Sequence, residues 1–318
     1  MIKSFFETIS ARGLAIALSA VLNTFRVNFE NKILNRKYVK RNVHNYQMFL
    51  DATDMGLCRS LILFGTREVD HKILLEKIAR PGMTVLDIGA NIGYYALMEL
   101  GLIGDSGKLI AVEPSPKNIE IFKMNLELNG KSGIRVIEGA ISDKSEKKDF
   151  HLAEQGNLNT FHATGTGLKH LTGEVVEVNS YTVPQIMEGE GQLDLIRMDV
   201  EGHEVEVMNG MLDSIRKGEM KPTIIFETHL SRYGEEHDME AVLKNYFDTG
   251  YKTRYLASSY EGGTEIVESR GYKGSAPIHT DGVQRKIFEN IKDQDAIDFI
   301  CNVGGARTVV LENNTFNA

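Results

Sequence analysis

The sequence predicts an α/β protein built on a doubly wound, mostly parallel sheet. Two observations carry this prediction. Short apolar segments alternate with helical segments from about residue 80 onward, and the first apolar segment runs into a glycine-rich turn in TVLDIGANIGYYAL (84–97). Strands that alternate with helices form a sheet covered on both faces, and right-handed crossovers make it doubly wound. With 318 residues and 42% hydrophobic content, the chain can fill one large domain or two small ones.

Turn residues mark where successive elements begin and end. Pro81-Gly82 precedes the first strand, Asn129-Gly130 ends the second helix, and Pro222 leads into the fifth strand. Strands are expected at 84–89, 108–114, 134–142, 193–202 and 223–229, with late strands at 251–257 and 307–313. Helices are expected at 92–102, 116–128, 205–218 and 238–249, and residues 143–190 are expected to be irregular.

Charge and cysteine content exclude several classes of protein. The formal net charge of −8 argues against nucleic acid as the main partner, because phosphate binding needs a basic surface. Cys58 and Cys301 lie far apart and form neither a disulfide framework nor a cysteine zinc motif. This usage suits a reducing compartment, so we expect a cytoplasmic protein.

Residues 1–50 read as a basic helical extension. Residues 1–45 carry a net charge of +6, and their apolar side chains recur at spacings of three and four. These apolar residues are Ile2, Phe5, Phe6, Ile9, Leu14, Leu18, Val21, Leu22 and Phe25. We favour a helix packed on the domain or on a second subunit of a homodimer. The alternatives are peripheral contact of residues 1–45 with an anionic membrane, and a signal peptide.

The glycine-rich turn indicates a bound nucleoside. It reads Gly89-Ala90-Asn91-Ile92-Gly93, so Asn91 replaces the middle glycine that a dinucleotide pyrophosphate requires. The turn therefore suits a phosphate-free ligand such as S-adenosylmethionine, whose ammonium can approach Asp87. Glu113, 24 residues after Gly89, is placed to accept both ribose hydroxyls. An NAD-dependent oxidoreductase and a catalytically silent nucleoside-binding module remain the alternatives.

A resemblance to a known family rests on several segments taken together. VLDIGANIGYYAL, AVEPSPKN, GAISD and LIRMDVEGHEVEVMNGM, followed by IIFETH, resemble the FkbM family of S-adenosylmethionine-dependent methyltransferases over about residues 50–230. The resemblance implies a seven-stranded Rossmann-like sheet with its last strand antiparallel, in a methyltransferase domain at 51–318. It also implies O-methylation of a sugar, glycolipid or similar small metabolite. The extension at 1–50 lies outside the shared part.

The resemblance assigns cofactor roles to individual residues. The methionine end would be held by Asp87, Gly89, Ala90, Asn91 and Gly93, and the ribose by Glu113. The adenine would be bordered by Pro114, Ser115, Ala140 and Ile141. Glu68 would approach the cofactor from the entrance, or would be an exposed helix carboxylate.

Chemistry is expected at the ends of the fourth and fifth strands. Asp199, Glu201 and His203 follow the fourth strand, and Glu227 and His229 end the fifth. If the strands continue that far, alternate side chains share a face and deliver a general base, with His229 favoured over His203. Alternatively, Glu201 and His203 belong to the first turn of the next helix.

A metal is the other way to activate a hydroxyl. Mg²⁺ held by Asp199 and Glu227 would lower the pKa of the acceptor. We do not favour it, because catechol-type O-methyltransferases, which share this fold, have an Asp-Asn pair where this chain has Glu227-Thr228-His229.

Two long polar segments are expected to bind the acceptor. Residues 151–182 and 258–282 are rich in Gly, Ser and Thr, as lids and binding loops often are. Tyr260, Tyr272, His162 and His170 within them suit a polyhydroxylated acceptor such as a sugar.

Overall fold

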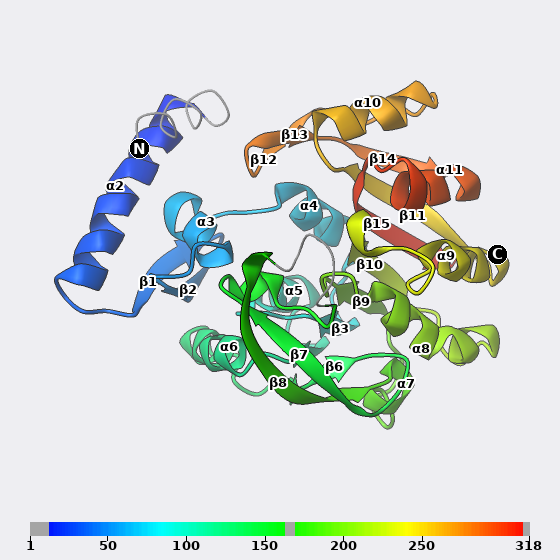
Figure 1. Cartoon of the computed structure of the whole chain (residues 1–318), viewed down its shortest axis with the longest axis horizontal. Coiled ribbons are helices and arrows are strands. Elements are labelled where there is room, and N and C mark those ends of the chain that lie inside the picture. Colours follow the sequence, from blue (N-terminus) through cyan, green and yellow to red (C-terminus); the bar gives the residue numbers. More distant parts are fainter. Residues whose placement is uncertain (1–12, 163–168, 314–318) are drawn as a thin grey trace.

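An eight-stranded sheet forms the centre of the computed structural model, which describes residues 13–162 and 169–313 (Figure 1). Its strand order is β14-β11-β15-β10-β9-β3-β4-β5, and the strands from β10 to β5 are parallel. Their bounds are β3 Thr84–Ile88, β4 Lys108–Glu113, β5 Arg135–Glu138, β9 Leu195–Met198, β10 Thr223–Glu227, β11 Tyr251–Ser258, β14 Ile287–Ile291 and β15 Ala306–Asn313. The predicted α/β fold class is confirmed.

The sheet differs from the expected one at its β14 edge. β15 runs antiparallel to β10, as expected for the last strand, and β14 adds an eighth strand antiparallel to β11. β14 exposes Glu289 and Asn290 in its middle, as an edge strand does, so its sequence lacks the apolar run that marked the inner strands.

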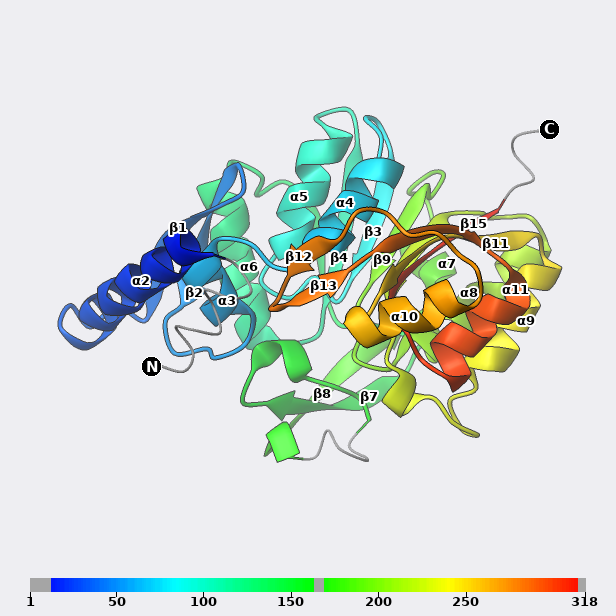
Figure 2. The same ribbon diagram turned by 90° about the horizontal axis from the view of Figure 1, so that it is seen from above.

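Alternate residues of the central strands enter two different hydrophobic clusters. In β10, Ile224 and Phe226 pack in a cluster with residues of α7 Val183–Ile186, α8 Glu204–Arg216, α9 Met239–Asp248 and α11 Asp293–Ile297. Ile225 faces the other cluster, with residues of α4 Val69–Ile78, α5 Tyr94–Ile103 and α6 Pro116–Leu128. Figure 2 shows α4 and α5 on one side of the sheet and α9 and α11 on the other. This two-sided burial explains the continuous apolar strands of the sequence.

The N-terminal extension is helical only in part. Helix α2 spans Leu14–Lys32, whereas β1 Tyr38–Val43 and β2 Tyr46–Asp51 form a hairpin that the sequence did not predict. α3 Leu57–Phe64 follows the hairpin. Val27, Val43 and Leu50 are buried in the same cluster as α4 and α5, so this segment packs on the domain. Ile2, Phe5, Phe6 and Ile9 lie outside the described residues, and a boundary at residue 50 stays a prediction.

A small second sheet lies beside the main one and was also missed. Residues 143–190 were expected to be irregular, but β6 Ala140–Ile141, β8 Leu171–Tyr181 and β7 Lys147–Ala153 form a sheet in that order. β8 is exposed on both faces over residues 172–175 and fully buries only Ser180, so no hydrophobic alternation marks its first half. The β7–β8 pair, called the flap below together with residues 154–162, lies to one side of the main sheet in Figure 2.

The expected loop at 258–282 is likewise structured. It contains α10 Glu261–Ser269 and β12 Ile278–Thr280, which pairs with β13 Val283–Arg285. Tyr260 is half exposed, and the Tyr272 hydroxyl donates to Asp295 (2.6 Å). Neither tyrosine lines a pocket at the carboxyl ends of β3, β4, β9 and β10, so their expected acceptor role is not supported.

Candidate active site

The glycine-rich turn is shaped by two positions that exclude a side chain. Gly89 has a φ of 79°, and a Cβ there would lie 2.2 Å from the Asp199 carbonyl oxygen. Gly93 has a φ of 87°, and a Cβ there would lie 2.3 Å from the Phe122 ring. Both positions therefore require glycine, and Gly89 brings the end of β3 directly against the end of β9.

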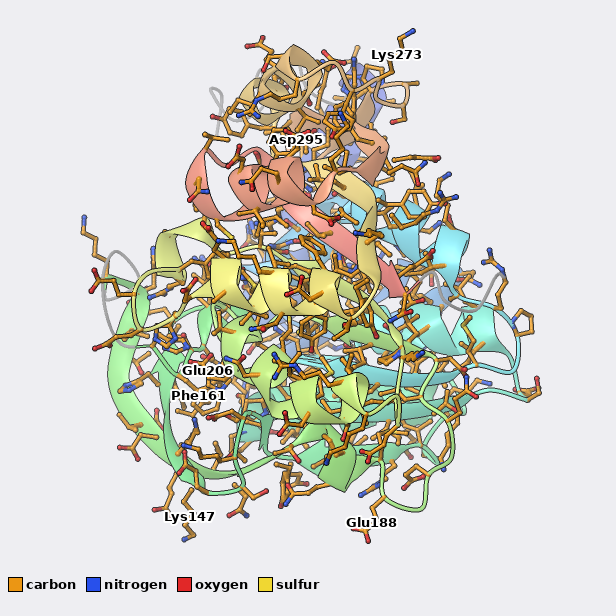
Figure 3. All side chains as sticks on the ribbon, turned by 90° about the vertical axis from the view of Figure 1, so that its right-hand side faces the viewer. Lys147, Phe161, Glu188, Glu206, Lys273 and Asp295 are labelled. Carbon is orange, nitrogen blue, oxygen red and sulfur yellow. The ribbon has the colours of Figure 1, made fainter. Side chains whose placement is uncertain are left out.

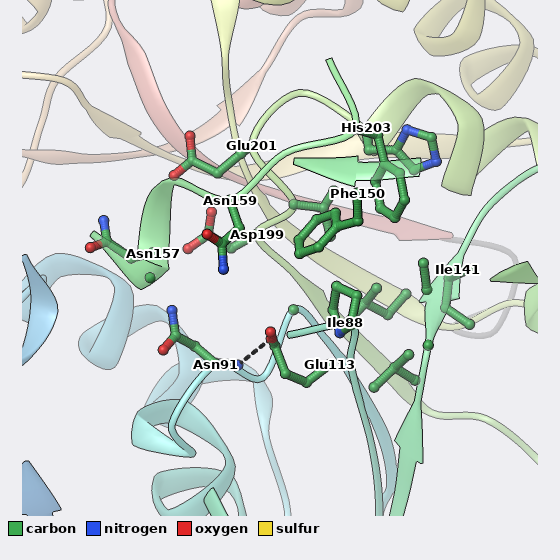
Figure 4. Close-up of a pocket in the computed structure, with 18 residues that line it drawn as sticks. Ile88, Asn91, Glu113, Ile141, Phe150, Asn157, Asn159, Asp199, Glu201 and His203 are labelled. Atoms are coloured by element: carbon green, nitrogen blue, oxygen red, sulfur yellow. Dashed lines mark hydrogen bonds between the residues drawn. The ribbon is translucent and has the colours of Figure 1, made fainter. Parts of the chain in front are cut away.

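Glu113, the last residue of β4, is bonded to the same turn. Its Oε2 accepts from the Asn91 backbone N–H (2.8 Å, dashed in Figure 4), and its Oε1 accepts from Ser115 N–H (2.9 Å) and Asn118 Nδ2 (3.1 Å). Burial raises the pKa of Glu113 to about 7, although these three hydrogen bonds lower it. A carboxylate offers about four acceptor positions, so one remains on Oε2, fewer than the two ribose contacts expected from the sequence.

An apolar pocket lies beside Glu113 and encloses about 490 Å³ of empty space. Pro114, which follows β4, and Ala140 and Ile141 of β6 line it, and their expected contact with adenine stays a prediction. Phe150 and Phe161 of the flap close it, with their ring centroids 4.7 Å apart. Figure 4 shows Phe150 and Ile141 on one side and Asn91, Asn157, Asp199 and Glu201 on the other. The first pocket thus has an apolar half and a polar half.

A second, more polar pocket of about 500 Å³ adjoins the first. Both pockets are lined by Gly89, Asn91, Asn157, Asp199 and Glu201. The second pocket is also lined by Glu68, Ala90, Tyr94, Tyr95, Glu227 and the three arginines Arg67, Arg197 and Arg307. A ligand that bridges both pockets would pass over the glycine turn.

A buried arginine ties β9 to the turn. Arg197 Nη1 lies 3.3 Å from Asp87 Oδ1 and donates to the Gly89 carbonyl (3.1 Å), while Nη2 donates to Asp199 Oδ2 (3.1 Å). The Arg197 guanidinium carbon lies 4.1 Å from the centre of the Tyr95 ring, a cation–π contact. Asp87 is fully buried and lines neither pocket. Direct contact of Asp87 with a cofactor ammonium, expected from the sequence, is therefore not supported.

Glu68 and Glu227 share one arginine. Arg307 Nη2 lies 3.1 Å from Glu68 Oε1 and 2.5 Å from Glu227 Oε1. Tyr95 also donates to Glu68 (2.7 Å), and although burial opposes ionisation, Arg67 and Arg307 lower the pKa of Glu68. Glu68 is buried at the start of α4 and lines the second pocket, so the alternative of an exposed helix carboxylate is wrong.

Glu201 is the titratable residue best poised for proton transfer. β9 ends at Met198, so Glu201 lies in a turn and not on the expected strand face. Burial raises its pKa to about 7, with Asp199 adding to the rise and His229 opposing it. A carboxyl with a pKa near neutrality, lining both pockets, suits a general base.

His229 lies behind the carboxylates and lines neither pocket. Its Nδ1 is 2.9 Å from Glu204 Oε1, and its Nε2 is 3.6 Å from both Glu201 Oε2 and Glu227 Oε1. Although burial opposes protonation, Glu204 and the other two carboxylates raise the pKa of His229 to about 10. The imidazole is then a cation at neutral pH, which disfavours its expected role as base.

His203 begins helix α8, as the alternative interpretation held. It is 2% exposed, lines the apolar pocket, and burial lowers its pKa well below the usual value. Its ring nitrogens face Ser142 Oγ (3.1 Å) and His162 Nε2 (3.1 Å), not the polar pocket.

Backbone strain gathers at the second pocket. Glu68, Asn91 and Glu201 are non-glycine residues with φ of 49°, 51° and 51°, and all three line this pocket. Such left-handed residues are uncommon outside turns and cluster at functional sites. Three of the seven such residues in the described part of the chain line this pocket, which makes it the candidate reactive site.

Several site residues escaped the sequence analysis. Arg197 had a readable signal, since a charged residue inside an apolar strand must find a buried partner. Asn157, Asn159 and Phe161 lie in the polar segment 151–182 that was expected to bind the acceptor, but nothing singled them out individually, and Phe150 lies just before that segment. Of the predicted residues, Gly93, Ser115, Asp87 and His229 support the pocket walls without lining them.

The fold and site together define an α/β protein of the Rossmann type with a two-part pocket at the carboxyl ends of its parallel strands. The sequence profile of the methyltransferase FkbM domain matches residues 87–253, which is more than half of the chain. The chain belongs to the FkbM methyltransferase family.

Similarity to individual proteins is local. The chain is 39% identical to protein-L-isoaspartate O-methyltransferase of Methanococcoides burtonii over 56 residues. This match covers 18% of this chain and 28% of that protein. The chain is 36% identical over 74 residues to ribosomal protein L11 methyltransferase of Pelotomaculum thermopropionicum, which covers 23% of each. The chain thus spans less than a third of the length of these relatives. A solved structure of methyltransferase FkbM from Methylobacillus flagellatus KT matches with a TM-score of 0.38 and 13% identity, over 73% of this chain and 52% of that one.

Proposed function

We propose that the chain is an S-adenosylmethionine-dependent O-methyltransferase acting on a hydroxyl of a sugar, glycolipid or similar small metabolite. One observation carries the proposal: the apolar pocket beside Glu113 and the polar second pocket meet at the turn that begins at Gly89. This turn lacks the middle glycine that a pyrophosphate would need. A nucleoside in the first pocket and a reacting hydroxyl in the second would thus lie next to each other at this turn. Membership of a methyltransferase family supports the same chemistry.

The cofactor would lie across both pockets. Its adenine would rest against Ile141 and Phe150, and one ribose hydroxyl would donate to the open position on Glu113 Oε2. The methionine end would meet the turn at Gly89 and Asn91. Asp87 would act through Arg197, which holds the ends of β3 and β9 together.

Methyl transfer needs orientation of the acceptor and removal of one proton. The acceptor oxygen would form a bond to the methyl carbon as the sulfur–methyl bond breaks, leaving neutral S-adenosylhomocysteine. The hydroxyl proton would pass to Glu201, whose pKa is about 7 and which, unlike Glu113 with a similar pKa, lines both pockets. His229 would stay protonated and hold the neighbouring carboxylates in place.

A metal-assisted reaction fits these residues less well. Asp199, Glu201 and His229 offer ligand atoms within 4.8 Å of one another, but a metal would have to displace the proton that the surrounding carboxylates hold on His229. Glu227 and Asp199 are already paired with Arg307 and Arg197. Mg²⁺ also prefers oxygen ligands, so we do not favour it.

The proposal is tested by incubating the protein with labelled S-adenosylmethionine and a panel of hydroxylated acceptors, including sugars and glycolipids. Transfer of label to an acceptor oxygen supports it. Label on protein or RNA acceptors, with none on hydroxylated small molecules, would contradict the substrate class.

Helix α2 supports a peripheral membrane role. Leu14, Leu18, Leu22, Phe25 and Phe29 follow one another at spacings of three and four, and each is more than half exposed. The chain alongside carries exposed basic side chains, namely Arg26, Lys32, Arg36, Lys37 and Lys40. Figure 1 shows α2 at the edge of the molecule, away from the main sheet. No helix in the described part of the chain is long and apolar enough to cross a bilayer.

We therefore propose that α2 lies on an anionic membrane surface, where a glycolipid acceptor would be within reach. The protein should sediment with vesicles containing phosphatidylserine and less with phosphatidylcholine alone. Leu22→Glu with Phe25→Glu should abolish sedimentation, whereas Val175→Glu, at another exposed apolar position, should not. A dimer in solution that the double variant dissociates, without vesicle binding, would assign the face to a second copy instead.

A further inference from the structure

Three histidines and a glutamate gather where the flap meets the start of α8. His162 belongs to the flap, His203 and Glu206 to the first turn of α8, and His237 to the segment before α9. The side chains of His203, His162 and Glu206 are 3%, 12% and 16% exposed. Figure 3 labels Glu206 and Phe161 on this flank of the molecule, and the Phe161 and His203 rings lie 4.7 Å apart. The proposed methyl transfer uses none of these polar groups.

Three donor atoms of this cluster face one point. His162 Nε2 lies 3.1 Å from His203 Nδ1, His203 Nδ1 lies 3.3 Å from Glu206 Oε2, and His162 Nε2 lies 3.9 Å from Glu206 Oε2. A tetrahedral ion with bonds of about 2.0–2.1 Å places its ligand atoms about 3.3–3.4 Å apart. The three separations bracket this value without any movement of the backbone.

The hydrogen bonds around the cluster point a lone pair of His203 inward, and His162 Nε2–H, which donates to it, would lose its proton to a bound ion. The Ser142 hydroxyl donates to Asp143 Oδ1 (3.1 Å), so it accepts from His203 Nε2–H (3.1 Å). The lone pair of His203 therefore lies on Nδ1, toward His162 and Glu206. Glu206 Oε2 is shielded from solvent and has no hydrogen-bond partner among the described residues, while His237 Nδ1 lies 2.7 Å from Glu206 Oε1.

We propose that His162 Nε2, His203 Nδ1 and Glu206 Oε2 bind Zn²⁺, with His237 orienting Glu206 from behind. Zn²⁺ favours imidazole and carboxylate ligands in tetrahedral geometry, whereas Mg²⁺ and Ca²⁺ favour oxygen alone. Ser142 and His237 would then orient the ligands His203 and Glu206 without binding the ion themselves. Three protein ligands leave the fourth position to water.

The ion would fasten the flap to α8. His162 follows Phe161, and both Phe161 and His203 line the apolar pocket. Zn²⁺ would hold this wall closed, so its effect would reach cofactor affinity although it touches no reacting atom.

The test starts from full-length protein stripped of metal with chelator and titrated with Zn²⁺ against a chromophoric competitor. We expect one ion per chain and a rise in Tm on the order of 5 °C at saturation. His162→Ala should lose this site, and His237→Gln should weaken it about 10–100-fold. His170→Ala, which removes an exposed histidine of the same flap region, is the matched control and should bind normally.

A variant that misfolds is recognised by circular dichroism, and Co²⁺ provides a test in the unmodified protein. Co²⁺ should give the intense visible absorption of a tetrahedral site, which Zn²⁺ should displace. Absence of saturable binding, an octahedral Co²⁺ spectrum, or unchanged stoichiometry in folded His162→Ala would overturn the proposal.

Discussion

His229 Nε2 lies 3.6 Å from Glu201 Oε2, and the two groups have pKa values of about 10 and about 7. Just above neutral pH the imidazole is therefore charged and the carboxylate is deprotonated. Environments that separate two pKa values in this way assign different roles to neighbouring groups. Glu201 becomes the candidate base and His229 a fixed cation beside it.

Glu201→Gln should lower kcat about 10²–10⁴-fold, the range for loss of a positioned proton acceptor. The amide keeps the size of the side chain, so cofactor affinity should change little. In the wild type, kcat at saturating cofactor should fall as pH drops below about 7, where Glu201 becomes protonated. That inflection should vanish in the variant; its persistence would point to another base.

Glu201→Gly separates catalysis from stability. Glu201 has a φ of 51°, which costs a side-chain-bearing residue about 1–2 kcal/mol and glycine almost nothing. The variant should have little activity. Its free energy of unfolding, measured in urea, should be about 1 kcal/mol higher than that of Glu201→Ala. Equal stability of the two would show that the turn is not strained.

His229 should stabilise the fold in a pH-dependent way. Its folded-state pKa of about 10 lies above the ordinary value of 6.5. The stabilisation is therefore complete below pH 6.5 and is lost as the pH rises through about 10. Urea unfolding of wild type and His229→Gln should differ most near pH 6 and converge toward pH 10. A constant difference would mean that the imidazole is not charged in the folded protein.

Arg197→Met should destabilise the fold by about 3–5 kcal/mol, because it leaves Asp87 buried without its counter-charge. Arg26→Met is the control, since Arg26 pairs with Glu30 at the surface with 63% of its side chain exposed. That change should cost no more than about 1 kcal/mol. If urea unfolding shows similar losses of free energy of unfolding in the two variants, Arg197 does not have this structural role.

The sequence predicted the parts of the fold that bury apolar residues on both faces. β3, β9 and β10 are almost fully buried, and their positions followed from apolar runs and bounding turns. Burial alternates along β1, but one of its buried residues is Arg41, and β8 is exposed on both faces over residues 172–175, so no clear apolar alternation marked the hairpin or the flap. Periodicity reports burial, and these strands are only partly buried.

Most predicted site residues do reach the two pockets, because the carboxyl ends of parallel strands meet at one edge of the sheet. The roles were harder to predict than the positions. Whether His229 is a base depends on Glu204, whose carboxylate approaches only after α8 packs against the end of β10. Likewise, Asp87 pairs with Arg197 on the neighbouring strand and so supports the turn instead of contacting a ligand directly.

The central claim is that the pocket beside Glu113 binds S-adenosylmethionine and not a dinucleotide, and calorimetric titration with S-adenosylhomocysteine and with NADH tests it most directly. We expect one S-adenosylhomocysteine per chain, no measurable NADH binding, and an affinity loss of about 1–3 kcal/mol in Glu113→Gln, which keeps the size of the side chain. Binding of NADH in preference to S-adenosylhomocysteine, or unchanged affinity in Glu113→Gln, would contradict the account.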